Sequence, residues 1–257
     1  MDSAAFSLIR SGIAQSVPSV LGFAETGASS GGSAWLQFPS PLPSSAEHLW
    51  FLSYESSQDA KRTLVGFENS NIRNGLSQDW NNGTDGFQTP RLKVIIDSGI
   101  KDYVMPAQVL GDRLHLLVSF QIVGTDAQIK AYLWDETSGA WTEAINALET
   151  GGTSTVFPYG AESGTSLFAS LGGQRITDLI SYRASFWTTT ELSGGLPDIS
   201  QAAVRNNFTN GLNLVDPAIS HSAFGVPLYD IHGPAATYNA GTNLGSGGDF
   251  TVNGTFT

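Results

Sequence analysis

The sequence predicts an all-β protein, a two-sheet antiparallel jelly-roll sandwich with one short helix. Three observations lead to this prediction. The 257 residues include 29 glycines, 11 prolines, 14 phenylalanines, 7 tyrosines and 6 tryptophans, which is rich in turn-forming and strand-forming types. Charged residues make up only 14% of the chain, below the roughly 25% of an average domain. Short apolar and aromatic runs recur between turn signals, and many short strands with few helices pack most naturally as two sheets.

The clearest pair of expected strands is a hairpin in the middle of the chain. Residues 113–123 and 128–134 are two runs rich in apolar residues, and residues 124–127 (Gly-Thr-Asp-Ala) favour a turn between them. A long polar loop is expected at residues 69–90. The other expected strands are residues 34–38, 48–54, 62–67, 92–96, 166–171 and 175–186.

A second turn, at residues 135–139, follows the hairpin and separates two tryptophans. Trp134 and Trp141 bracket this turn. Aromatic side chains that face each other across two antiparallel strands stabilise the pair. We therefore expect these two residues to form a cross-strand pair.

The one expected helix covers residues 198–208. Asp198 would cap its first turn, and Gly211 would stop it. The apolar side of this helix would consist of Ile199, Ala202, Ala203 and Val204.

The pattern divides the chain into three parts. Residues 1–32 are expected to be an N-terminal arm or linker, and residues 33–215 the β-sandwich. Residues 216–257 are expected to be a Gly-rich extension with a last strand, because Phe250 and Val252 alternate with polar residues after a flexible loop.

The charge balance argues against several partners. The chain carries 12 basic and 23 acidic residues, a net charge of −11, and it has no cluster of lysines and arginines. Phosphate backbones and anionic membranes are bound by such clusters, so we expect neither nucleic acid nor a membrane as partner. The chain has no cysteine, which excludes disulfides, thiolate metal sites and cysteine nucleophiles. Its first residues lack a basic stretch followed by an apolar run, so no signal peptide is expected.

The second half of the predicted sandwich resembles a known family. The strand that ends in residues 170–173 (Ser-Leu-Gly-Gly) is followed by residues 176–184 (Ile-Thr-Asp-Leu-Ile-Ser-Tyr-Arg-Ala) and then by the helix. This order resembles the concanavalin A-like lectin/glucanase (laminin-G-like) jelly roll. The resemblance covers residues 34–212, with its best part at residues 113–210. It implies a two-sheet sandwich of lectin type.

The C-terminal residues carry a second resemblance. Residues 229–252 run from Tyr-Asp-Ile-His-Gly-Pro to Gly-Gly-Asp-Phe-Thr-Val. They resemble the C-termini of laminin-G-like structural proteins of tailed bacteriophages, especially marine ones. This implies a virion component, either a capsid decoration (cement) protein that contacts the major capsid protein or a surface fibre.

One loop is a candidate ligand site. Asp79, Trp80, Asn82 and Asp85 lie close together in a polar, Gly-containing stretch. Oxygen-rich loops bind Ca²⁺, and an exposed tryptophan beside amide groups can stack on a sugar ring. The alternative is a turn whose Asn, Asp and Gly residues bond their own backbone.

No catalytic or metal-binding pattern is apparent, so we expect a protein that is not an enzyme. Retaining glycosidases need two carboxyl groups about 5 Å apart, and no acid spacing of that type occurs. Residues 27–31 match G-x-S-x-G by letter but lie in a Gly-Ser run, which we interpret as a linker. No metal-ligand spacing relates the four histidines, and the two that lie in apolar strands, His48 and His115, are expected to be core or sheet-face residues.

These observations lead to two functional hypotheses. The first is a non-enzymatic virion structural protein of a tailed phage, located in the virion and assembled as a homo-oligomer. Residues 1–30 and 216–257 would then carry the contacts with neighbouring molecules. The alternative is a carbohydrate-binding module or adhesin that recognises host-surface glycans.

Overall fold

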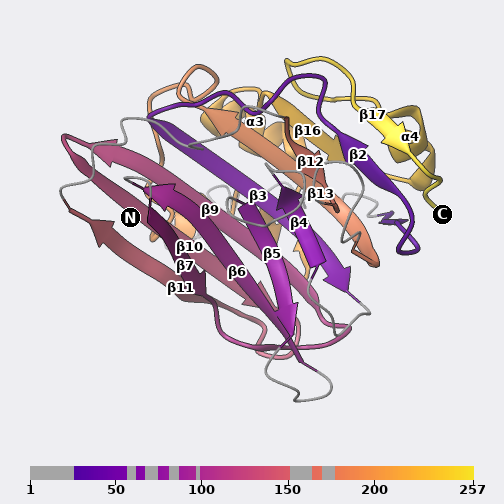
Figure 1. Cartoon of the computed structure of the whole chain (residues 1–257), viewed down its shortest axis with the longest axis horizontal. Helices are drawn as coiled ribbons and strands as arrows, with labels where there is room; N and C mark the ends of the chain where they lie inside the picture. Colours follow the sequence, from indigo (N-terminus) through magenta and orange to yellow (C-terminus); the bar gives the residue numbers. More distant parts are fainter. Residues whose placement is uncertain are drawn as a thin grey trace, which may run out of the picture.

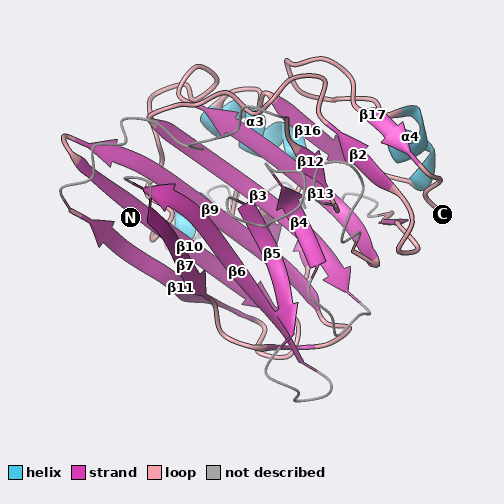
Figure 2. Cartoon of the chain, viewed as in Figure 1, coloured by secondary structure: helices cyan, strands magenta, loops and turns pink. Residues whose placement is uncertain are grey.

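The structure is a computed structural model that describes residues 26–56, 62–66, 75–80, 87–96, 99–150, 164–169 and 177–257. Strands dominate these residues and form two large antiparallel sheets (Figures 1 and 2). The predicted all-β, two-sheet antiparallel sandwich is therefore confirmed.

The first sheet has seven strands in the order β1-β13-β3-β9-β10-β11, with β16 also paired to β13. The predicted central hairpin is present as β9 and β10. The register also pairs Trp134 with Trp141 across β10 and β11, as expected. The strands are β1 (Ala28–Ser29), β3 (Glu47–Ser56), β9 (Arg113–Val123), β10 (Asp126–Asp135), β11 (Ala140–Glu149), β13 (Leu179–Thr188) and β16 (Tyr229–His232).

The second sheet has eight strands in the order β17-β2-β12-β4-β5-β6-β7, with β8 paired to β6. Its strands are β2 (Trp35–Gln37), β4 (Arg62–Gly66), β5 (Gly75–Trp80), β6 (Phe87–Ile96), β7 (Gly99–Val104), β8 (Gln108–Val109), β12 (Ser166–Leu167) and β17 (Thr251–Asn253). A separate small ribbon consists of β14 (Thr209–Asn210) and β15 (Asn213–Leu214).

Three expectations about local structure are wrong. The polar loop at residues 69–90 contains β5 and the start of β6, which pair with each other, and β5 also pairs with β4. Residues 28 and 29, expected in a linker, form β1 against β13. The expected helix at residues 198–208 is reduced to the single turn α2 (Ala202–Arg205), which has no side-chain cap. Asp198, the expected cap, instead accepts hydrogen bonds from Ser200 in a turn.

The C-terminal segment, residues 216–257, contributes to both sheets. It adds β16 to the first sheet and β17 to the second. It also contains two helices that the sequence did not predict, α3 (Pro217–Phe224) and α4 (Ala235–Ala240), the latter beside β17 (Figure 1). Tyr238, Phe250 and Phe256 are buried in the main core. This segment therefore has an internal role in holding the sandwich together.

Apolar side chains fill two layers, one on each face of the first sheet. In β3, Trp50 and Leu52 point into the main core between the sheets. The alternating residues Leu49 and Phe51 belong to a second cluster on the outer face. A strand that is covered on both faces carries a continuous apolar run, which explains the sequence of β3. Burying each such side chain contributes about 1.5–3 kcal/mol.

The outer cluster is covered by residues 192–224. Ile199, Phe208, Leu214 and Phe224 pack from this segment onto the sheet. The cover ends at Gly225, which has a φ of 98°. Any other residue here would place its Cβ 2.1 Å from Glu191 O, so only glycine fits. The cover leaves the margin of the sheet at β10 and β11 partly open, and the candidate site lies there.

Candidate functional site

A row of polar and aromatic side chains crosses the outer face of the first sheet. Strand pairing places one residue from each of six neighbouring strands in this row. Their neighbours along the strands, such as Leu52, Leu116 and Leu133, point into the main core instead. In order from β16 to β11, the row consists of His232, Arg183, Ser53, His115, Trp134 and Trp141.

A groove of about 320 Å³ lies at the β11 end of this row. The strands that form one wall, β10 and β11, lie side by side in Figure 1. We call this cavity the tryptophan groove. The hairpin of β10 and β11 supplies one side, and the segment from α2 to α3 supplies the other. Its lining consists of Trp134, Gly139, Ala140, Trp141, Asn206, Thr209, Asn210, Gly211, Val215 and Ile219.

His115 holds the two sides of the tryptophan groove together. Its ring stacks on Trp134 with the centroids 4.8 Å apart and the planes at 28°. Its Nε2 lies 3.1 Å from Leu212 O, in the turn between β14 and β15. Because a carbonyl only accepts, Nε2 carries the proton and donates, and Nδ1 accepts from Ser53 Oγ at 2.9 Å. The imidazole therefore fixes the β14–β15 ribbon against the sheet.

Burial keeps His115 uncharged. Desolvation of the fully buried ring lowers its pKa from 6.5 to about 3, although the hydrogen bond with the Leu212 carbonyl acts in the opposite direction. The expectation that His115 lies on a sheet face is confirmed, and so is the burial of His48. A neutral imidazole under the groove makes its geometry independent of pH near neutrality.

The lining of the tryptophan groove is uncharged. None of the described residues that form it is an acid or a base. Trp141 is partly buried, and Ile219 is 37% exposed. Thr209 is buried, and among the described residues its hydroxyl has no hydrogen-bond partner. The site thus combines aromatic and aliphatic surface with the amide groups of Asn206 and Asn210.

The structure separates this groove from the loop that the sequence suggested. Asp79 and Trp80 end β5 in the second sheet, where they pair with Thr89 and Gln88 of β6. Asn82 and Asp85 lie outside the described residues. The loop stays a prediction for a Ca²⁺ or glycan site.

Sequence reasoning identified Trp134 and Trp141 as a stabilising pair but missed the groove. The sequence contains one signal for such a groove, which is the amide-rich stretch at residues 206–210 after the predicted strands. Nothing local in the sequence connects that segment to the hairpin, and the connection is made only by the fold.

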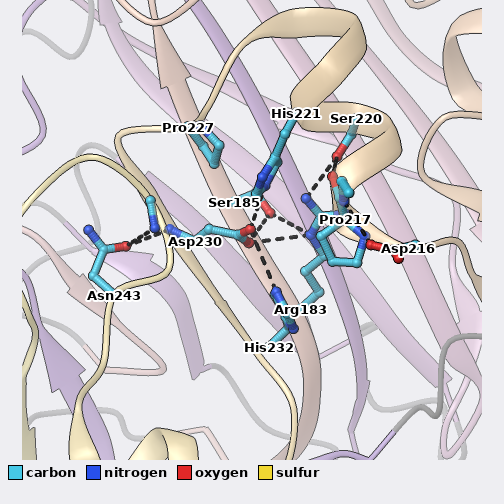
Figure 3. A network of polar contacts seen from close by, with 12 residues as sticks. Arg183, Ser185, Asp216, Pro217, Ser220, His221, Pro227, Asp230, His232 and Asn243 are labelled. Atoms are coloured by element: carbon cyan, nitrogen blue, oxygen red, sulfur yellow. Dashed lines mark hydrogen bonds and ion pairs between the residues drawn. The ribbon is translucent and has the colours of Figure 1, made fainter.

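A second polar cluster joins the C-terminal segment to the first sheet (Figure 3). Arg183 Nε lies 3.3 Å from Asp230 Oδ1, and both side chains are 0% exposed. Ser185 Oγ donates to the same oxygen at 2.7 Å. His221 Nε2 donates to Asp230 Oδ2 at 2.8 Å, and Arg183 Nη2 donates to Ser220 Oγ at 2.9 Å.

This cluster is structural. Burial by itself would raise the pKa of Asp230, but the Arg183 guanidinium and the hydrogen bond with His221 outweigh it and lower the pKa to about 2. The carboxylate is therefore charged, paired and inaccessible to a ligand. It ties β16 and α3 to β13.

The described residues contain no group of three His, Asp or Glu side chains arranged to hold a metal ion. None of the helices in the described part of the chain is long and apolar enough to cross a membrane.

The two packed sheets and their antiparallel strands define a jelly-roll sandwich. A search found no matching protein-family model and no matching curated protein. Among solved structures, the chain is similar to a protein from Bacteroides ovatus ATCC 8483 that is provisionally described as carbohydrate-binding. The TM-score is 0.54 at 14% identity, over 91% of this chain and 60% of that protein's length.

A second solved structure is less similar. It is the native heptameric SAP-like pentraxin of Limulus polyphemus, with a TM-score of 0.37 and 13% identity over 64% of this chain and 70% of the pentraxin chain. At 14% identity, the similarity to the Bacteroides protein shows the jelly-roll fold alone. This agrees with the fold that the sequence predicted.

Proposed function

We propose that this protein binds carbohydrate and that the tryptophan groove is its glycan site. The observation that carries the proposal is the groove itself, in which two tryptophans face amide side chains and no charged residue lines the cavity. Its volume of about 320 Å³ lies at the lower end of the range of about 300–1,000 Å³ for small-molecule sites.

The chemistry of the lining suits a sugar. An aromatic ring offers a flat apolar surface with a negative face, which matches the C–H face of a pyranose. Amide groups offer both donors and acceptors, which match the hydroxyl groups at the ring edge. Asn206 and Asn210 supply these groups beside Trp141.

The same lining favours binding over catalysis. Glycoside hydrolysis needs two carboxyl groups that flank the scissile bond, and the described lining contains none. The fold, and the provisional description of the Bacteroides protein as carbohydrate-binding, support the same proposal.

The proposal is tested by a glycan array followed by titration calorimetry with the Trp141→Ala variant. Trp141 is the better target because Trp134 is only 4% exposed and stacks on His115, so that its removal would disturb the fold. Central tryptophans often contribute 2 kcal/mol or more to binding, so we expect at least a tenfold loss of affinity, about 1.4 kcal/mol or more.

The matched control is Thr251→Ala, an exposed position on β17 in the other sheet. It should bind as the parent protein does. Equal affinity of Trp141→Ala and the parent, with the fold intact by circular dichroism, would exclude the tryptophan groove as the site. A parent protein that binds no glycan would refute the proposed function.

A virion location stays a prediction that rests on the resemblance of residues 229–252 and on the low content of charged residues. It is compatible with glycan binding, since a surface component can do both. Quantitative mass spectrometry of purified particles tests it. A fixed ratio to the major capsid protein would support a decoration protein, and complete absence would leave a free glycan-binding protein.

A further inference from the structure

A second, smaller cavity lies on the same outer face, at the other end of β10. Its volume is about 110 Å³. We call it the lysine pocket. The residues from the sheet are Ser119, Gln121, Gln128 and Lys130, and residues 196–199 close the other side. We propose that the lysine pocket and the tryptophan groove are the two ends of one extended site for a neutral oligosaccharide chain.

This inference rests on the proposed function, and the spacing along β10 supports it. Alternate residues of this strand point outward, so Gln128, Lys130, Tyr132 and Trp134 share one face. Lys130 lines one cavity and Trp134 the other. Four residues of strand span about 13 Å. That distance exceeds a single sugar ring and fits a short oligosaccharide.

The edge strand β11 forms a continuous border along this path. Its register places Trp141 beside Trp134, Glu143 beside Tyr132, and Asn146 beside Lys130. Among the described residues, β11 is the last strand on this side of the sheet, so a ligand can approach there. Asn146 also accepts a hydrogen bond from Gln128 Nε2 at 3.2 Å, so amide groups border both cavities.

The stretch between the two cavities is rigid. Tyr132 donates from its hydroxyl to Glu143 Oε2 at 2.7 Å. The Arg205 guanidinium lies 4.5 Å from the centre of the Tyr132 ring, and Arg205 Nη1 donates to Ile199 O and Ser200 O at 2.7 Å. The Tyr132 ring is only 8% exposed under this cover, so a chain that joins the two cavities runs over the exposed side chains of Glu143 and Asn146 on β11.

The charges along the path cancel, which indicates a neutral ligand. Lys130 Nζ lies 3.1 Å from Asp198 Oδ1 in the lysine pocket. Tyr132 contacts one positive and one negative group, the Arg205 guanidinium over its ring and the Glu143 carboxylate at its hydroxyl. With no local excess of positive charge, the net charge of −11 repels acidic chains such as uronate polymers.

The test is a chain-length series measured by titration calorimetry. The probes are neutral β-glucan, β-mannan and α-mannan oligosaccharides, each from disaccharide to hexasaccharide. We expect affinity to rise with length until the chain spans both cavities. Gln128→Ala should lower the affinity for the longest bound chain at least fivefold and leave the disaccharide unaffected, whereas Trp141→Ala should weaken both.

The outcomes separate the inference from the proposed function. If Gln128→Ala and Lys130→Met bind the long chain as the parent does while Trp141→Ala does not, the tryptophan groove acts alone and the extended site is refuted. If an oligouronate binds as tightly as the neutral chain of equal length, the specificity for a neutral ligand is refuted. If Trp141→Ala has no effect on any chain, the proposed function of the groove fails as well.

Discussion

Replacing Asp230 with asparagine tests the role of the buried cluster that joins the C-terminal segment to the first sheet. The substitution keeps the shape of the side chain and removes its charge. Arg183, 0% exposed, is then left without its counter-ion. Breaking a buried ion pair in this way costs about 3–5 kcal/mol.

The pKa of Asp230 gives a second measure of the same interaction. Arg183 and His221 overcome the effect of burial and lower this pKa from 3.8 to about 2, which corresponds to roughly 2–3 kcal/mol of stability by linkage. Because the folded-state pKa is the lower one, this contribution is fully present above about pH 4. It is lost as the pH falls through about 2.

The assay is urea unfolding at pH 7. A loss of about 3 kcal/mol, with an m-value of about 3 kcal/mol/M for a chain of this size, shifts the midpoint by about 1 M. The control is Asp198→Asn, which removes an ion pair with Lys130 from a side chain that is 45% exposed. Exposed pairs contribute about 0–1 kcal/mol, so its midpoint should move far less.

Equal midpoint shifts for Asp230→Asn and Asp198→Asn would refute the reasoning. A further check is Arg183→Met in the Asp230→Asn background. It should recover part of the lost stability, because no uncompensated charge then remains buried.

Two further predictions concern the core and the histidine under the groove. Phe256→Ala should lower the free energy of unfolding by about 3–5 kcal/mol and lower the Tm measured by calorimetry by about 6–20 °C. An unchanged Tm would contradict the internal role of the C-terminal segment. The pKa of His115 is about 3 in the folded protein, so as the pH falls below 6.5 this histidine takes up a proton only in the unfolded chain. Between pH 6.5 and about 3, the free energy of unfolding should therefore fall by about 1.4 kcal/mol per pH unit. In urea unfolding measured across this pH range, the His115→Gln variant should lack this contribution to the pH dependence of the free energy of unfolding. The same pH dependence in the variant and the parent would refute the low pKa of His115.

The central hairpin shows what local sequence determines. The strands β9 and β10 were predicted because the apolar run of each strand and the Gly-Thr-Asp-Ala turn at residues 124–127 are signals that act over a few residues. The pairing of Trp134 with Trp141 follows from the next turn by the same logic. Composition was enough for the fold class, because two covered sheet faces require this much apolar and aromatic surface.

Elements that depend on distant partners were not predicted. The strand β5, Gly75–Trp80, has the sequence GLSQDW, which lacks β-branched residues and a clear alternation. It is a strand because β4 and β6 bind it on both sides. In the same way, residues 198–208 carry a helical pattern, yet Ile199 and Phe208 must both reach the outer cluster, and only one helical turn remains between them.

The sequence by itself therefore determined the class of fold, the central hairpin and the tryptophan pair. Only the tertiary structure decided where the tryptophan groove lies, which is the site that we propose for a glycan. The tryptophan groove exists because His115 bonds the carbonyl of Leu212, 97 residues later in the chain, and thereby holds Asn206 and Asn210 opposite Trp141. Turn chemistry and alternation act between near neighbours, whereas a binding site is formed by contacts between segments that are brought together only when the sheets pack.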